Sequence, residues 1–275
     1  MIARFVPIAA AAVLVCGLAG QAVAADGIQI VQKVTNGTTV QTFQIQMDNT
    51  HMRAEIADAA GRKQVILFDG TRQAVDIVDM ERKSYVEMTK ADIERVAAQM
   101  QGAMAMMQQQ MANLPPAQRA QMEAMMRGRG MPGAAPVAKT EYKRNGTDHV
   151  GRWTCDKYDG YQNGEKTSEL CTVSPTALGF GMTDLDVSRQ LAEFYSKLVP
   201  QQADQIVSVG RVEDQGFAGF PVRRVFKIGP NQATMEVTEA GRANIPASQF
   251  VVPAGFTKTE MPGINGMGAR GGRGR

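Results

Sequence analysis

Residues 89–131 read TKADIERVAAQMQGAMAMMQQQMANLPPAQRAQMEAMMRGRGM, and this stretch differs in composition from everything around it. It is rich in Met, Gln and Ala, and it has no aromatic residue and no β-branched residue after Val96. Such a composition favours helix. The flanking segments are short runs of alternating apolar and polar residues, separated by Gly or Asn-Gly. We therefore predict a mainly β protein of the α+β class, in which a long Met-rich helical hairpin joins two β-rich halves.

The first arm of this insertion is predicted to be an amphipathic helix from Thr89 to Leu114. Thr89 and Asp92 have the spacing of a capping box, with Asp in place of the usual Glu or Gln. Pro115 and Pro116 end the helix because neither can donate a backbone N–H, and a second arm is expected over 117–127. Apolar residues recur along the first arm at alternating spacings of four and three, which places them in one stripe: Ile93, Ala97, Met100, Met104, Met107, Met111 and Leu114.

Four methionines of this stripe, Met100, Met104, Met107 and Met111, are the candidate ligand-binding residues. Their thioether side chains are flexible, which suits an adaptable cover that lies on the β-sheet. A stripe that faces a membrane or a protein partner is a second interpretation. Copper handling is a third, because thioethers select Cu(I), although the insertion has no His or Cys to complete such a site. We expect no metal and no cofactor.

The N-terminal sequence MIARFVPIAAAAVLVCGLAGQAVAAD is typical of a secretory signal peptide. A positive charge, an apolar run and the cleavage site Ala22-Val23-Ala24 follow one another in order, so the predicted signal peptide is 1–24. Cys16 follows Val15 where a lipobox needs a small residue, and we expect no lipid anchor. The mature chain is therefore expected to be periplasmic or secreted.

Charge and composition limit the partners and the domain organisation that we expect. The formal net charge of +3 is too small for a polyanionic partner, so we expect no nucleic-acid binding. Residues 263–275 are rich in Gly and Arg and have no core-forming pattern, which predicts a disordered basic tail. Weak adhesion of this tail to anionic envelope surfaces is the alternative. Residues 25–262 remain as one domain, with the helical insertion at 89–131.

The β-rich halves read as antiparallel hairpins. Six strands precede the insertion, and Asn36-Gly37 marks the first turn. After the insertion, Asn145-Gly146 and Asn163-Gly164 mark two more turns. A helix from Thr183 or Asp184 to Val199 comes next, and Pro200 stops it. Three strands near 206–213, 222–228 and 233–238 follow, and the proline-punctuated segment 244–256 is expected at a sheet edge.

Only two cysteines, Cys155 and Cys171, lie outside the signal peptide, and an exported chain meets an oxidising compartment. A three-residue loop of Gln162, Asn163 and Gly164 would place the two cysteines directly opposite each other. Directly opposed strand residues are within disulfide range. We therefore predict a structural disulfide, and a redox-active pair is disfavoured because the spacing is not C-x-x-C.

No catalytic motif is present, and we expect that the protein is not an enzyme. His51 and His149 lack the spacing of a zinc-binding HExxH motif, and no G-x-S-x-G occurs. No run of glycines with the spacing of a phosphate-binding fingerprint lies between a predicted strand and a predicted helix, which is the context that such a fingerprint requires.

Four blocks of sequence together resemble a known family: the signal peptide, QVILFDG with the strands that follow it, the MANLPPAQRAQMEAMM insert, and the late GFPVRRVFKIG to IPASQFVVPAGF region. The chain is similar to the bacterial envelope family catalogued as domain of unknown function 4412. That family is in turn similar to the lipoprotein carriers of the LolA and LolB type and to RseB-type regulators. The resemblance implies a strongly curved antiparallel sheet, or half-barrel, wrapped around helices. It also implies an apolar concave face that can hold acyl chains.

Two main hypotheses follow, with copper handling as a third. The chain binds an apolar ligand such as a lipid or a lipoprotein acyl chain, or it is an envelope module that binds another protein and no small molecule. An apolar cavity under the insertion would favour the first hypothesis, and a filled concave face would favour the second.

Overall fold

The computed structural model describes residues 24–57, 61–115, 118, 140–196, 216–228 and 231–260. Four predicted segments lie outside these ranges: the signal peptide except Ala24, the second helical arm except Gln118, the strand near 206–213 and the C-terminal tail. The six predicted strands before the insertion are all present: β1 Ala24–Asn36, β2 Thr39–Met47, β3 His51–Ala57, β4 Lys63–Asp69, β5 Ala74–Asp79 and β6 Ser84–Thr89. The later strands are β7 Glu141–Val150, β8 Trp153–Gln162, β9 Glu165–Val173, β10 Phe220–Ile228, β11 Asn231–Pro246 and β12 Thr257–Lys258.

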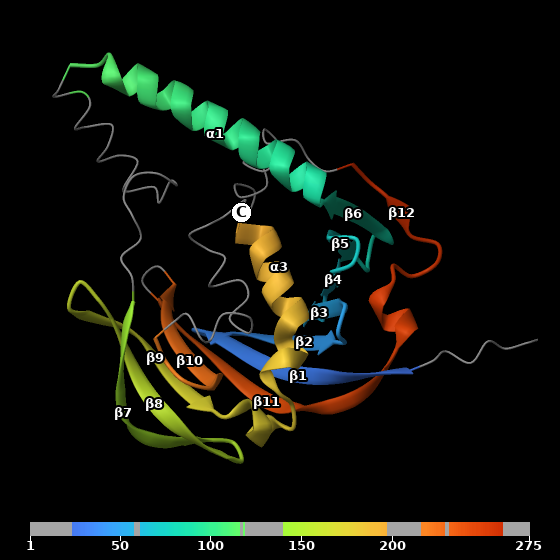
Figure 1. Ribbon diagram of the computed structural model, residues 1–275, viewed down its shortest axis with the longest axis vertical. Helices are drawn as coiled ribbons and strands as arrows, with labels where there is room; N and C mark the ends of the chain where they lie inside the picture. The colour runs from blue at the N-terminus through green and yellow to red at the C-terminus, as the bar shows by residue number, and fades with distance from the viewer. Residues whose placement is uncertain are drawn as a thin grey trace, which may run out of the picture.

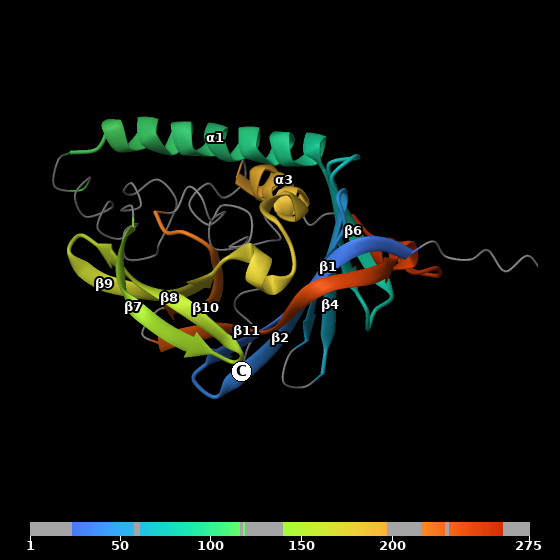
Figure 2. The same ribbon diagram turned by 60° about the horizontal axis from the view of Figure 1, so that its bottom comes forward.

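All twelve strands belong to one sheet with the order β12-β6-β5-β4-β3-β2-β1-β11-β10-β9-β8-β7. Every neighbouring pair is antiparallel except β12 with β6. The sheet is strongly curved, and its two wings meet at the long β1 and β11 (Figures 1 and 2). The predicted fold, a curved antiparallel sheet with inserted helices, is therefore confirmed.

The prediction for Asn145-Gly146 is wrong. These residues do not form a hairpin turn, because β7 runs through them and the register with β8 shifts between Arg144 and Thr147. Gly146 has a φ of 84°, a left-handed conformation that glycine adopts without strain. The extra residues form a bulge, and the chain reverses at Gly151 instead. Asn-Gly sequences suit bulges and turns alike, which is why the local pattern did not separate them.

The predicted disulfide between Cys155 and Cys171 is present, with its Cα atoms 5.4 Å apart. The predicted register is wrong, however. The turn has two residues, Asn163 and Gly164, both with positive φ, and it pairs Gln162 with Glu165. A register shift next to Gly160 then places Cys171 opposite Lys157. The cysteines are therefore diagonal neighbours, and the twist of the hairpin brings them within bonding distance.

Helix α1, Lys90–Ala112, confirms the predicted first arm of the insertion. The Thr89 side chain accepts a hydrogen bond from the Asp92 backbone N–H, and the Asp92 carboxylate accepts one from the Thr89 backbone N–H, which completes the capping box. Within the described part of the chain, packing of α1 against the core is shown for its first turns. Ile93 is buried in the main core, but Met107 and Met111 are only half-buried.

Helix α3, Asp186–Ser196, lies between the first turns of α1 and the sheet (Figure 2). It follows two short 3-10 helices, η1 Pro175–Leu178 and η2 Met182–Leu185, and it buries one face on the sheet. Phe194 packs on Phe68 of β4 with a ring-centroid distance of 5.9 Å. Burial raises the pKa of the neighbouring Tyr195 hydroxyl to about 12. We call the face of β1–β6 that α3 covers the inner face.

The opposite, outer face of β4–β6 is covered by the C-terminal segment, which contains the 3-10 helix η4 Ala247–Phe250 and the edge strand β12. Val252 and Phe256 pack against a small buried cluster of Val65, Leu67 and Val78. Asp76 is also buried on this side, and its Oδ1 has no hydrogen-bond partner.

We expect Asp76 to make stability depend on pH. Burial, followed by the negative charge of Glu87, raises the pKa of Asp76, and this outweighs the positive charges of Arg72 and Lys258. A raised folded-state pKa gives a contribution to stability that is present below the unfolded pKa of about 3.9 and is lost as the pH rises through the folded value. The difference in unfolding free energy between Asp76→Asn and the unmodified protein should therefore shift in favour of the variant as the pH rises from 4 to 7. Urea unfolding at both pH values measures this, and an equal difference at the two pH values would contradict it.

Candidate functional site

The inner face of β1–β6 is built from rows of directly paired residues, whose side chains point the same way. The row nearest the start of α1 is fully buried and forms the floor under α3: Met88, Val75, Phe68, Met52, Met47 and Ile28. The middle row is apolar and only partly covered on its β6 side: Val86, Ile77, Ile66, Ala54, Ile45 and Ile30. The third row is more polar: Ser84, Asp79, Gln64, Ile56, Phe43 and Gln32.

Next to the area that α3 covers, half-buried apolar side chains form a continuous surface across these rows, which we call the open strip; three of them, Ala54, Ile66 and Ile77, also pack against the main core. Its members are Phe43, Ala54, Ile56, Ile66, Ile77 and Val86. Strand residues alternate between faces, and each of β2–β6 contributes one or two inner-face residues to the strip. Partly exposed apolar side chains that lie next to one another form a candidate binding surface.

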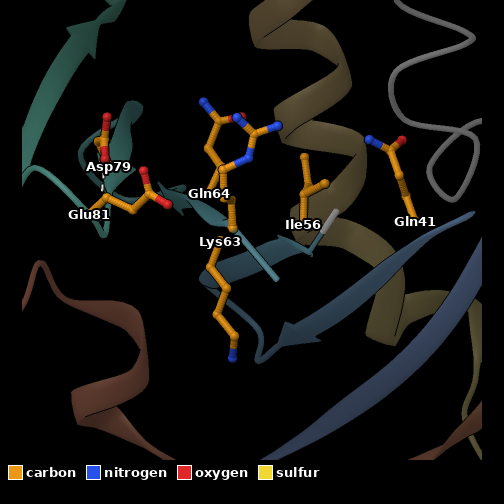
Figure 3. A pocket seen from close by; sticks show the side chains of 7 residues that line it. Gln41, Ile56, Lys63, Gln64, Asp79 and Glu81 are labelled. Carbon is orange, nitrogen blue, oxygen red and sulfur yellow. Dashed lines mark hydrogen bonds between the residues drawn. The ribbon is translucent and has the colours of Figure 1, made fainter. Parts of the chain in front are cut away.

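The open strip ends in a pocket of about 290 Å³ at the ends of β2–β5. Seven residues line it: Gln41, Ile56, Arg62, Lys63, Gln64, Asp79 and Glu81. Figure 3 shows Ile56 and Gln64 pointing to one side of the sheet, while Lys63 points away from them. Ile56 is thus shared by the strip and the pocket, so the apolar surface continues directly into a polar mouth.

Charged side chains around this mouth are held by local interactions. The Asp79 carboxylate accepts hydrogen bonds from the backbone N–H groups of Glu81 and Arg82, at 3.1 and 3.0 Å. Lys63 forms an ion pair with Glu55, 2.7 Å from Nζ to Oε1. Burial raises the pKa of the Glu55 carboxyl group, but Lys63 and Arg53 lower it by more, so the pKa lies below its usual value. Both signs of charge therefore lie at the mouth.

Of the four methionines predicted as ligand-binding residues, the two with described side chains, Met107 and Met111, are not among the residues that line this pocket. The pocket and α1 lie at opposite ends of β6. The pocket residue Asp79 pairs with Ser84 at the start of this strand, whereas α1 follows Thr89 at its end. Met107 and Met111 are half-buried on α1, and the side chains of Met100 and Met104 lie outside the described part of the chain. Ligand binding by this stripe stays a prediction.

The alternation of β2–β4 predicts an apolar face, yet no local pattern indicated that part of this face is only half-buried in the described part of the chain. Among the described residues, no group of three His, Cys, Asp or Glu side chains is placed to hold a metal ion. No helix in the same ranges is long and apolar enough to cross a membrane.

Fold and site define a class: a single curved, open antiparallel sheet whose inner face is partly filled by a helix and partly open, with a polar mouth. The chain belongs to the family described as domain of unknown function DUF4412, whose profile matches residues 86–256. The matched segment includes α1 and β7–β11 and starts after most of the strands that line the pocket.

Solved structures with a similar course of the chain were also found. An uncharacterized conserved protein from Thermus thermophilus is 9% identical, with a TM-score of 0.42, over 85% of this chain and 90% of that one. MucB in complex with MucA(peri) is 11% identical, with a TM-score of 0.36, over 86% of this chain and 57% of MucB. A MucA/MucB complex from Pseudomonas aeruginosa is 11% identical, with a TM-score of 0.34, over 84% and 56%. No curated protein matches the chain.

Proposed function

We propose that this is an exported, non-catalytic binding protein for an amphiphile, such as a lipid or an acyl chain, whose apolar part lies on the open strip. One observation carries the proposal: a half-buried apolar surface on the inner face continues, through Ile56, into a pocket with polar walls. Ligand sites are typically concave and apolar with a few polar groups that fix orientation. An amphiphile matches both parts of this surface.

The energetics favour an aliphatic chain on the strip. Each methylene that leaves water contributes about 0.8 kcal/mol, and the strip is a preformed surface that needs little reordering. The pocket volume is at the lower end of the range for ligand sites, which suits a polar group or the end of a chain rather than a whole drug-sized molecule.

The expected compartment supports the proposal. The buried bond between Cys155 and Cys171 fits an oxidising compartment, where such bonds persist. The predicted signal peptide would direct the chain out of the cytoplasm, into such an oxidising compartment.

A second candidate function is protein binding without a small ligand. The packing of α3 favours it, because Val187, Leu191 and Phe194 already fill much of the inner face. In that case the open strip receives side chains of a partner protein. The two candidates differ in whether the purified protein binds a small apolar probe.

We expect the protein to bind N-phenyl-1-naphthylamine, whose fluorescence increases in apolar surroundings, and hexadecanoate to displace it. Ile56→Gln should weaken probe binding about tenfold, equivalent to about 1.4 kcal/mol, because a polar amide replaces apolar surface at the centre of the site. The matched control is Val251→Gln, which changes an exposed apolar residue away from the inner face. Probe binding that is absent, or equally weakened by both substitutions, would contradict the proposal.

A further inference from the structure

Arg224 of β10 carries a guanidinium group that has no acidic partner among the residues that the structure describes. Its Nε is buried and has no hydrogen-bond partner. The side chain is half-buried. Its guanidinium group makes a cation–π contact with Phe226, with Cζ 5.8 Å from the ring centroid. The neighbouring Arg223 differs, because it forms an ion pair with Asp148.

The surroundings of Arg224 are apolar. Its directly paired neighbours are Leu170 on β9 and Met235 on β11. A positive charge that loses water without gaining an anion is unfavourable, and a donor left unpaired adds to that cost. A bound anion would satisfy both the charge and the buried Nε–H.

A second unpaired donor lies on the adjacent strand. The Ser168 Oγ is buried and has no hydrogen-bond partner. Ser168 pairs with Phe226, which is two residues from Arg224 on the same strand, so Ser168 and Arg224 are diagonal neighbours on one face. Gly160 leaves space for this hydroxyl, since a Cβ there would lie 2.2 Å from Ser168 Oγ. A guanidinium group and a hydroxyl group together are a typical donor set for a carboxylate or a phosphate.

Strand pairing places Arg224 on the same face as the open strip. Arg224 pairs with Met235, Met235 with Val34, and Val34 with Gln41, which lines the pocket. The span from β10 to β2 is three strand spacings, roughly 14 Å along the sheet. Figure 2 shows that the sheet curves between these wings, so the two regions lie on the concave side of one sheet.

We propose that the ligand of this protein is an anionic amphiphile, whose carboxylate or phosphate group binds Arg224 and Ser168 while its chain extends along the open strip. This inference rests on the proposed function and adds the charge and the orientation of the ligand to it. The guanidinium plane presents paired N–H donors, which match the two oxygens of a carboxylate or phosphate.

Three ligands with the same sixteen-carbon chain test the inference: hexadecanoate, hexadecyl phosphate and the neutral hexadecanol. Their dissociation constants are measured by displacement of N-phenyl-1-naphthylamine below the micelle concentration. The unmodified protein should bind at least one of the two anions at least tenfold more tightly than hexadecanol. The ratio between the two anions distinguishes a fatty-acid carboxylate from a phosphate head group.

Arg224→Gln should abolish the preference for anions and leave hexadecanol binding unchanged, and Ser168→Ala should reduce the preference by a smaller factor. Lys227→Gln is the matched control, because it removes the same charge from an exposed position on the opposite side of the same strand. Arg224→Lys keeps the charge and should retain part of the preference. It tests the same site if Arg224→Gln fails to fold.

The possible failures are distinguishable. If the unmodified protein binds all three ligands equally, or if Arg224→Gln keeps the preference, the anion site is wrong while the proposed function stands. If the unmodified protein binds none of the three ligands, the proposed function is wrong as well.

Discussion

Replacing Phe194 by alanine should destabilise the protein by about 3–5 kcal/mol and at the same time strengthen binding of apolar ligands. Phe194 is buried between α3 and the inner face, where its ring packs on Phe68 at 5.9 Å and on Tyr195 at 5.7 Å. Removing the ring leaves a cavity that continues into the open strip. The loss of packing lowers the free energy of unfolding, while the new space admits more of an aliphatic chain.

Urea unfolding followed by tryptophan fluorescence measures the first effect, and displacement of N-phenyl-1-naphthylamine by hexadecanoate measures the second. Phe194→Leu is the control, because it keeps most of the apolar volume and should change both quantities less. A variant that loses stability without any gain in ligand affinity would show that the space under α3 does not communicate with the strip.

Removal of the disulfide should cost about 3 kcal/mol of stability and leave ligand binding unchanged. The bond joins residues 16 positions apart, so it mainly restricts the unfolded chain. Both cysteines are buried, and Cys155 lies in the same core as Val150 and Trp153 rather than on the open strip. We therefore expect the disulfide to stabilise the fold without affecting the ligand site at the open strip.

The double variant Cys155→Ala/Cys171→Ala, compared with the unmodified protein in urea, measures this cost. Addition of reductant should destabilise only the unmodified protein, which controls for the change in side-chain volume. A reduction-insensitive free energy of unfolding, or a loss of ligand affinity in the double variant, would contradict this assignment.

Local patterns predicted much of the fold. Alternation located β1–β6, the capping box at Thr89 and Asp92 located the start of α1, and Leu191 and Phe194 lie on the buried face of the predicted helix that became α3. These features depend on neighbours in sequence, so a single chain suffices to infer them.

The errors have a shared physical origin in non-local pairing. The bulge at Gly146 and the register shift beside Gly160 are set by how a strand fits its partner across the twisted sheet, and the Asn-Gly signal is the same for a bulge and a turn. How deeply the stripe of α1 is buried also depends on non-local packing. Ile93 is the one residue of the stripe that is fully buried within the described part of the chain, because α3 occupies the space beneath the first turns of α1.

The candidate site was not predictable as a site. The alternating sequence puts Phe43 and Ile56 on the apolar side of their strands, but their exposure depends on where α3 ends across the sheet. Arg224 carried no signal in sequence, since it differs from Arg223 only in having no acidic partner among the described residues.

Native mass spectrometry tests the central proposal most directly. The protein should be produced with its N-terminal segment in a Gram-negative host, purified without detergent, and measured with and without extraction by organic solvent. We expect the mature chain together with an amphiphile of a few hundred daltons that extraction removes and added hexadecanoate replaces. A spectrum that shows only the bare chain, both as purified and after addition of hexadecanoate, would contradict the proposal that this protein binds an amphiphile.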